Sequence, residues 1–557
     1  MLGLSVVIGI YFGYFGKKQI TPNEYLLGGK TMKVFPVAMS LVASNISSIA
    51  MLSIPADVYK FGATVIFISI SHIIGCIVAA YITVPVFHQL QITSTYEYLE
   101  LRFNSKIRIM GSILYNINTL LYLPIVIYGP ALALSQATSV NLHLVNPIIC
   151  AICIFYTTIG GLKTVVWTDT LQLIAMFGAL IAVLIIGVTS IGGIGNVFLQ
   201  ASIGERLNID FDIDPTKRDT FWAIVIGWTI FSMPQIAVNQ GSVQKFLSLP
   251  TMLGAKQALI IYGFGTIFFK SSGILIGLIM YAKYHDCDPL TTKVVKKDDQ
   301  LLPYYVMDVA SKIPGLSGLF IAGIFCASLS TLSAHMNSLS GLIYEDFIFG
   351  FMPKDIDQTK VSNILKIIVI IIGVVATSLI FVIQHLGGLF ALGITLSGIT
   401  AGPLLGLFSL GMIFPFANSK GAFAGSVSSL VLTSFIVIKN QIYKASGAIK
   451  YVPKPLSTEG CPTNFTNLAS SPYNTSPVPD EDIFVLFRIT HYYNTFIGVM
   501  ILLLIALPVS WLTRDDTQVD KKLITPPMRW SIRRTTKESN DIIYAEELVE
   551  LHKRANI

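Results

Sequence analysis

Residues 32–58 read MKVFPVAMSLVASNISSIAMLSIPADV, and the polar run Ala43-Ser-Asn-Ile-Ser-Ser48 interrupts their apolar course. The stretch is long enough to cross a bilayer, because a membrane-spanning helix needs about 20 mostly apolar residues. Serine and asparagine side chains can satisfy the backbone groups that a break in such a helix sets free. The stretch therefore predicts a membrane-spanning helix that is broken near its middle.

A second apolar segment, residues 219–246, has a comparable interruption. Ser232-Met-Pro-Gln235 lies in its middle, and Asn239-Gln240 follows. Proline removes a helix hydrogen bond and clashes with the preceding turn. The two segments are the second and the seventh apolar stretches of the chain, and broken helices at corresponding positions of two halves are typical of secondary transporters. A pair of ordinary kinked helices is the alternative.

The whole chain is poor in charged residues. Of its 557 residues, 53% are hydrophobic and 12% are charged, whereas soluble domains carry about 25% charged residues. A scan for apolar stretches finds about thirteen, and the alternating pattern of a membrane β-barrel is missing. We therefore expect an all-α polytopic membrane protein with about thirteen transmembrane helices, and we exclude a soluble multidomain enzyme.

The basic residues indicate how the chain crosses the membrane. Lys17, Lys18 and Arg102 lie in short loops beside apolar stretches, and Lys163 and Lys245 lie in later loops of the same parity. The positive-inside rule places such loops in the cytoplasm. We expect a plasma-membrane protein with an extracellular N-terminus and a cytoplasmic C-terminus. The net charge of +7 then comes from basic residues in cytoplasmic loops, and we expect no nucleic-acid partner.

The polar loop 441–484 is predicted to be extracellular. Asn464-Phe-Thr and Asn474-Thr-Ser in this loop are candidate glycosylation sites. Cys287 and Cys461 both fall in predicted outside loops, where an oxidising compartment permits a disulfide. The sequence leaves open whether these two cysteines pair.

The run Ala327-Ser-Leu-Ser-Thr331 is a candidate cation site. Ala327, Ser330 and Thr331 share one helix face, since they are spaced i, i+3 and i+4. Their hydroxyls, together with carbonyl oxygens freed by a broken helix, suit a hard cation such as Na⁺. The alternative is that these small polar residues merely line a contact between membrane helices.

Two ionisable residues, Asp169 and Lys270, lie in or at the start of predicted spans. A charged group inside a span costs about 2.5–3.5 kcal/mol on insertion scales, so such residues are functional candidates. Asp169 is alternatively a helix-start acid favoured by the helix dipole, and Lys270 either faces an anionic substrate or pairs with a neighbour. The isolated His72 and His335 are interpreted as packing residues. His-Glu-x-x-His and Gly-x-Ser-x-Gly motifs are absent, so we expect no enzyme.

Several longer motifs follow one another in a characteristic order. They are Glu24-Tyr-Leu-Leu-Gly-Gly-Lys30, the stretch from Gly160 to Gln172, Asn239-Gln-Gly-Ser-Val-Gln-Lys-Phe-Leu247 and Gly402-Pro-Leu-Leu-Gly-Leu-Phe-Ser-Leu-Gly-Met412. These motifs resemble the sodium/solute symporter family, in particular the branch that holds multivitamin, monocarboxylate and iodide transporters. The resemblance implies a LeuT-type core of two inverted five-helix repeats, and Na⁺ as the co-transported ion.

The resemblance also implies which residues form the sites. The family's sodium site uses carbonyls of the first broken core helix and hydroxyls of the eighth, and Asp169 matches an acid that the family links to sodium coupling. The matching sodium-site positions are Ala43, Ile46, Ala327, Ser330 and Thr331. The substrate-binding candidates are Ala50, Ser232, Gln235, Asn239 and Lys270. Gln235 replaces an aromatic gate of the sugar branch and Ala50 replaces a polar residue, which argues against a sugar.

The expected organisation divides the chain into six parts. The first part, residues 1–31, contains a first helix that is short for a membrane span, so part of it could be missing. The others are 32–191 as the first repeat, 192–218 as an extracellular loop, 219–414 as the second repeat, 415–513 with two peripheral helices and loop 441–484, and 514–557 as a cytoplasmic tail. We expect a symporter in the lipid bilayer that imports Na⁺ with a small organic anion, a monocarboxylate or a vitamin carboxylate, without an obligate protein partner. Iodide, a sugar or polyol, an uncoupled facilitator or channel, and a solute sensor are the alternatives.

Overall fold

A computed structural model describes residue 3 and residues 7–8, 10–11, 28–92, 94–138, 140–310, 313–353, 357–383, 389–462, 483–514 and 519–529. Most of the first apolar segment lies outside these ranges. Asn464 and Asn474 also lie outside the described residues, so their glycosylation stays a prediction. Within the described ranges the chain is almost entirely helical, and the β-structure there is a single bridge between Asp210 and Thr220.

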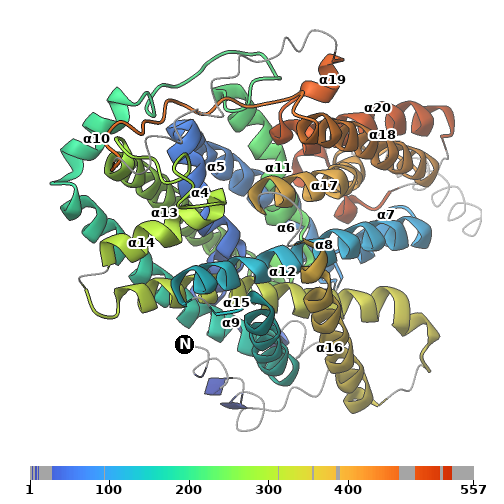
Figure 1. The fold of residues 1–557 in the computed structure, drawn as a ribbon. Helices are drawn as coiled ribbons and strands as arrows, with labels where there is room; N and C mark the ends of the chain where they lie inside the picture. The colour runs from blue at the N-terminus through green and yellow to red at the C-terminus, as the bar shows by residue number, and fades with distance from the viewer. Residues whose placement is uncertain are drawn as a thin grey trace, which may run out of the picture.

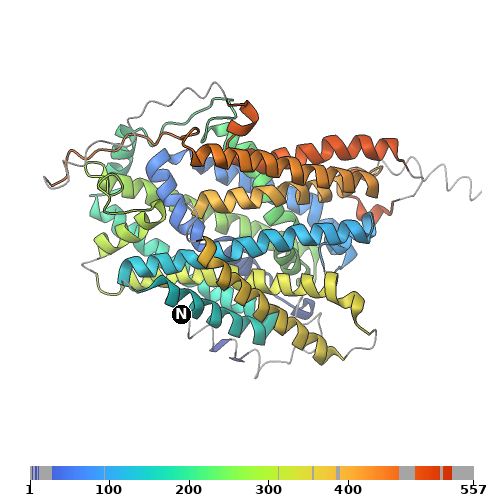
Figure 2. The same cartoon turned by 45° about the vertical axis from the view of Figure 1, so that its right-hand side comes forward.

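The helices form one bundle, in which α18 and α20 lie side by side at an edge remote from α9 and α16 (Figures 1 and 2). The α-helices of the described ranges include α3 (Val34–Asn45), α4 (Ser48–Phe61), α5 (Ile68–Val78), α6 (Val84–Leu90), α7 (Glu97–Arg102), α8 (Ser105–Thr138), α9 (Leu142–Ser190), α10 (Ile194–Ile203) and α11 (Thr229–Met233). They continue with α12 (Gln240–Leu247), α13 (Met252–Tyr284), α14 (Leu301–Ala310), α15 (Leu316–Ile343), α16 (Gln358–Ile383), α17 (Leu389–Ile413), α18 (Ser419–Ala445), α19 (Val485–Arg488) and α20 (Asn494–Leu512).

The membrane-spanning helices agree with the apolar stretches of the sequence. Among the described residues, 8 helices are long and apolar enough to cross a membrane, or 9 if the bent pair α3–α4 counts as one span. Leu144–Ile159, Ala223–Val238 and Ser397–Ile413 are shorter apolar helices, and Ala223–Val238 falls within the predicted stretch 219–246. The all-α membrane architecture is confirmed, whereas the number of thirteen helices stays a prediction.

The predicted break in residues 32–58 is present. Helices α3 and α4 bend by 57° where they meet. At the join, Ile46 adopts an extended backbone with φ −99° and ψ 93°. Ser47 then caps α4, because its hydroxyl accepts a hydrogen bond of 3.3 Å from the Ala50 amide. The polar run therefore supplies the caps that a broken helix needs inside a membrane.

The second break lies slightly further along the chain than expected. Pro234 begins a π-helical turn, η6 (Pro234–Val238), and the chain stays helical through it. The extended backbone comes at Asn239, with φ −63° and ψ 129°, and the Asn239 side chain caps α12 by accepting from the Ser242 amide at 3.2 Å. A π-bulge accommodates the missing proline N–H, so the break falls at the first good capping residue instead of at the proline.

The chain that follows the last span returns to the bundle. The Tyr98 hydroxyl donates a hydrogen bond of 3.0 Å to the Leu523 carbonyl, and the Thr525 amide donates one of 3.0 Å to the Met412 carbonyl. Ile524 is buried. Residues 519–529 therefore pack against α7 and α17.

A disulfide joins two loops that are far apart in the sequence. Cys287, which follows α13, forms a disulfide with Cys461, which follows α18, and their Cα atoms are 4.9 Å apart. The pairing that the sequence left open is thus present. Because disulfides persist in oxidising compartments, this bond marks the end of the bundle that faces the extracellular side in the expected topology.

Candidate functional site

A cavity of about 150 Å³ lies beside the break between α3 and α4. Four of the predicted substrate residues, Ala50, Ser232, Gln235 and Lys270, line this central cavity. Asn239 does not line it. Its amide instead donates a 3.1 Å hydrogen bond to Gln235 Oε1, and Asn239 lines a smaller neighbouring cavity.

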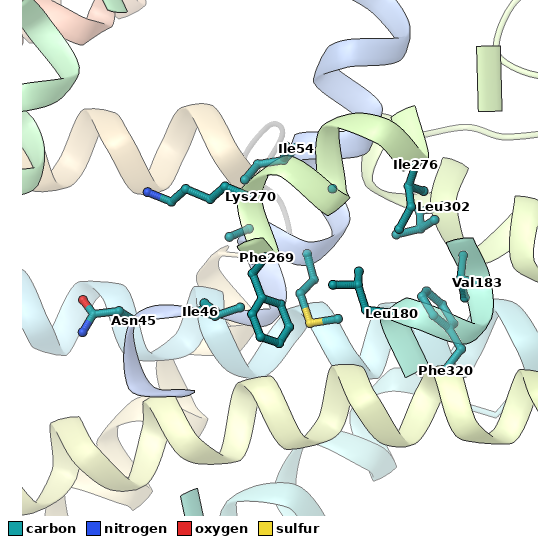
Figure 3. Close-up of a pocket in the computed structure, with 13 residues that line it drawn as sticks. Asn45, Ile46, Ile54, Leu180, Val183, Phe269, Lys270, Ile276, Leu302 and Phe320 are labelled. Carbon is teal, nitrogen blue, oxygen red and sulfur yellow. The ribbon is translucent and has the colours of Figure 1, made fainter. Parts of the chain in front are cut away.

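Lys270, in the middle of α13, brings a positive charge to the central cavity. Its ammonium lies 5.3 Å from the centre of the Trp228 ring. Within the described part of the chain, no carboxylate lies within 4.0 Å of it. In Figure 3, Lys270 and Asn45 lie on one side of a side pocket, and Leu180 and Phe320 lie on its other side. An ammonium without an acid partner in a low-dielectric site favours an anionic ligand.

Two histidines that the sequence suggested as packing residues also line the central cavity. His72 on α5 is 2% exposed, its ring centre is 5.1 Å from that of Tyr262, and neither ring nitrogen bonds to a described residue. His335 Nδ1 on α15 lies 2.8 Å from the Thr331 carbonyl oxygen. The sequence could not show these positions, since an isolated histidine carries no spacing signal.

Four of the candidate sodium residues, Ala43, Ala327, Ser330 and Thr331, meet on the α3 side of the same break. Ser330 Oγ lies 2.9 Å from the Ala43 carbonyl oxygen, and Thr331 Oγ1 lies 3.2 Å from that of Ser44. Both hydroxyls also contact the Ala327 carbonyl, at 3.1 Å and 3.0 Å. Ile46 forms the break itself. The structure thus gathers neutral hydroxyl and carbonyl oxygens, the donor set that suits a hard monovalent cation.

Asp169 lies next to this oxygen cluster and is fully buried. Its Oδ2 accepts hydrogen bonds from Ser40 Oγ at 2.6 Å and from Ser44 Oγ at 3.1 Å. Lys245 Nζ lies 3.3 Å from the same oxygen and also contacts the Ser44 hydroxyl. Ser44 therefore touches both groups, because its carbonyl meets Thr331 and its hydroxyl meets Asp169 and Lys245.

The position of Lys245 corrects the topology argument. We expected it in a cytoplasmic loop, yet its side chain lies in the core and the residue is only 1% exposed. Helix α12 starts at the second break and is held against the core, for example by a 2.6 Å hydrogen bond from the Thr95 amide to Gln240 Oε1. The ammonium of Lys245 thereby offsets the buried charge of Asp169. Sequence spacing gave no sign of this pair, since the two residues are 76 positions apart.

A scan against family models matches residues 25–428 to the sodium:solute symporter family. The chain belongs to this family. Na⁺ is accordingly its co-transported ion, and the chain is a multi-pass membrane symporter for a small solute and not an enzyme.

Individual relatives agree with this family. The symporter is 40% identical over 527 residues to the sodium-coupled monocarboxylate transporter 1 of Xenopus laevis, covering 92% of this chain and 84% of that one. It is 33% identical over 561 residues to a putative sodium-dependent multivitamin transporter of Drosophila melanogaster, covering 96% of this chain and 91% of that one. The solved structure of a Na⁺-coupled sialic acid symporter, in a substrate-bound outward-open state, matches with a TM-score of 0.75 and 22% identity, covering 93% of this chain and 97% of that one. This likeness confirms the LeuT-type fold.

Removing one partner of the buried Asp169–Lys245 ion pair should destabilise the symporter. Lys245→Met leaves the Asp169 carboxylate buried without its cation, which typically costs about 3–5 kcal/mol. We expect a lowered Tm of the purified protein in detergent, and a partial recovery in the double variant Lys245→Met/Asp169→Asn, where the unpaired charge is gone. Lys420→Met, at an exposed lysine, is the control. An unchanged Tm in Lys245→Met would contradict the pairing.

Proposed function

We propose that this symporter imports a small monocarboxylate together with Na⁺ across the plasma membrane. The observation that carries the proposal is the Lys270 ammonium, which faces the central cavity without an acid partner among the described residues. The cavity of about 150 Å³ supports a small substrate, because an engineered cavity of that volume accommodates benzene. A small monocarboxylate fits this space better than a larger vitamin carboxylate does.

In this proposal the carboxylate binds to Lys270, and its body lies between Ala50 on α4 and Ser232 and Gln235 on the second broken helix. A charged hydrogen bond to an ammonium contributes about 1.5–3 kcal/mol. Ala50 leaves room where a larger side chain would fill the cavity.

Sodium binds in the same proposal at the oxygens around the break. The carbonyls of Ala43, Ile46 and Ala327 and the hydroxyls of Ser330 and Thr331 surround it. A cation there would hold α15 to α3, since its ligands come from both helices.

Coupling follows from the position of the break between the two sites. Ala43 and Ser44 meet the hydroxyls of α15, whereas Asn45, Ser47 and Ala50 line the central cavity. An ion that fixes the break also orders the cavity wall, so each ligand raises the affinity of the other by the same factor. The Asp169–Lys245 pair holds Ser44 from the other side.

Import also requires a direction across the membrane. The disulfide between Cys287 and Cys461 supports an extracellular position of that end of the bundle, and hence an extracellular N-terminus and a cytoplasmic C-terminus. Residues 32–191 and 219–414 would be the two inverted repeats. Each net positive charge that enters with the substrate then gains about 2.3 kcal/mol per 100 mV of membrane potential.

The proposed substrate class is tested by tracer uptake in cells that express the chain. We expect lactate uptake that requires Na⁺, and little uptake of biotin, pantothenate, iodide, glucose or inositol. Equal lactate uptake after replacing Na⁺ with choline would instead show an uncoupled facilitator. Uptake of iodide or a sugar without lactate would refute the carboxylate proposal.

The sodium ligands are tested by the variant Ser330→Ala/Thr331→Ala. Because two hydroxyl ligands are lost, we expect the Na⁺ concentration for half-maximal uptake to rise about tenfold or more, where tenfold corresponds to about 1.4 kcal/mol. Ser328→Ala is the matched control on the same helix, since its hydroxyl bonds to the Val126 carbonyl at 2.8 Å instead. A well-expressed double variant with unchanged Na⁺ dependence would remove both residues from the ion site.

The role of Lys270 is tested by Lys270→Met, which keeps much of the side-chain volume and removes the charge. The ratio of Vmax to KM for lactate should fall about tenfold or more, as expected for a lost charged hydrogen bond. Lys283→Met, at the exposed end of the same helix, should behave as the unsubstituted protein. Full lactate uptake by Lys270→Met would show that the carboxylate binds elsewhere.

A further inference from the structure

A second, charged cavity of about 260 Å³ lies at the end of the bundle that carries the disulfide. Its lining includes Asp57, Lys60, Arg218, Asp298, Lys444 and His491. We call it the outer cavity.

Helix α4 connects the outer cavity to the central one. Ala50 and Ile54 line the central cavity, whereas Asp57 and Lys60 line the outer cavity. Seven residues of α-helix, from Ala50 to Asp57, advance by about 10 Å. A solute that arrives from the disulfide side therefore meets the outer cavity about two helical turns before the central cavity.

Most charges of the outer cavity cancel in pairs. Lys60 Nζ lies 2.8 Å from Asp298 Oδ2, and Arg218 forms an ion pair with Asp57. Asp299, which also lines the cavity, accepts a 2.8 Å hydrogen bond from the Ser53 hydroxyl and is buried.

Lys444 is the exception among these cations. Its ammonium lies 5.2 Å from the centre of the Tyr451 ring, and no described carboxylate lies within 4.0 Å of it. His491 also lines the cavity, is buried, and its Nε2 has no partner within the described ranges. Lys444 and Arg218 also repel each other electrostatically. The lining holds as many carboxylates as cations, but Lys444 is the cation among them that has no described carboxylate within 4.0 Å. The outer cavity therefore offers an anion one ammonium and one unsatisfied ring nitrogen.

We propose that the outer cavity is a capture site for small carboxylates, with Lys444 as its principal charge. The inference rests on the proposed carboxylate transport and adds a second binding position ahead of Lys270. A charge-assisted hydrogen bond from this ammonium would hold a carboxylate in the outer cavity before it moves on to Lys270. The Tyr451 ring holds the ammonium at the cavity wall without neutralising it.

The test measures tracer lactate uptake by Lys444→Gln in whole cells at constant Na⁺. We expect KM to rise about three- to tenfold at low ionic strength with Vmax unchanged, because the variant loses the charged hydrogen bond that captures the carboxylate. Lys444→Arg should restore KM. Raising the ionic strength with choline chloride should shrink the difference, because the Debye length falls to about 8 Å at 0.15 M.

Lys439→Gln is the matched control. Lys439 lies on the same helix and also faces an aromatic ring, with its ammonium 6.0 Å from the centre of Phe435, but it does not line the outer cavity. Its KM should equal that of the unsubstituted protein.

Two results would overturn the inference. One is an unchanged KM in a well-expressed Lys444→Gln variant, and the other is a lower Vmax at unchanged KM, which would place Lys444 in a conformational step. If the proposed transport function is wrong, the unsubstituted protein itself takes up no lactate. This outcome is distinct from a failure of the capture site alone.

Discussion

The break between α3 and α4 is the constraint on which the rest of the site depends. A helix that is interrupted inside a membrane must satisfy its freed backbone groups within the protein. Here Ser47 caps α4, and the hydroxyls of Ser330 and Thr331 meet carbonyls of α3. The requirement that makes the break possible also brings hydroxyl and carbonyl oxygens together. The proposed sodium site thus uses the same oxygens that hold this helix open.

The core of the bundle contains few ionisable side chains. Some of them have an oppositely charged partner, and others do not. Asp169 and Lys245 form a buried ion pair beside Ser44. Lys270 and Lys444 line cavities without carboxylate partners in the described ranges. The two cavities are about two turns of α4 apart in depth, so these lysines outline a path that an anion would follow from the outer cavity to the central one.

Much of the site was predictable because local sequence rules apply to it. The polar run at residues 43–48 and the i, i+3, i+4 spacing of Ala327, Ser330 and Thr331 identify the break and the hydroxyl face, and the structure brings these residues together. The positions of Lys245, His72 and the Cys287–Cys461 disulfide were not predictable in the same way. Each depends on contacts between segments far apart in the chain, about which local spacing contains no information.

The sequence by itself determined that this is a helical membrane protein with two interrupted helices and few intramembrane charges, because hydropathy and capping act over one or two helical turns. Only the tertiary structure decided which of those charges are neutralised. Lys245 is paired because α12 packs against α3 and reaches Asp169 on α9. Lys444 has no described carboxylate within 4.0 Å, since Asp57 and Asp298 of its cavity pair with Arg218 and Lys60, and Asp299 accepts a hydrogen bond from Ser53. Burial raises the free-energy cost of an unpaired charge. Which partner neutralises that charge depends on the packing of helices that are far apart in the sequence.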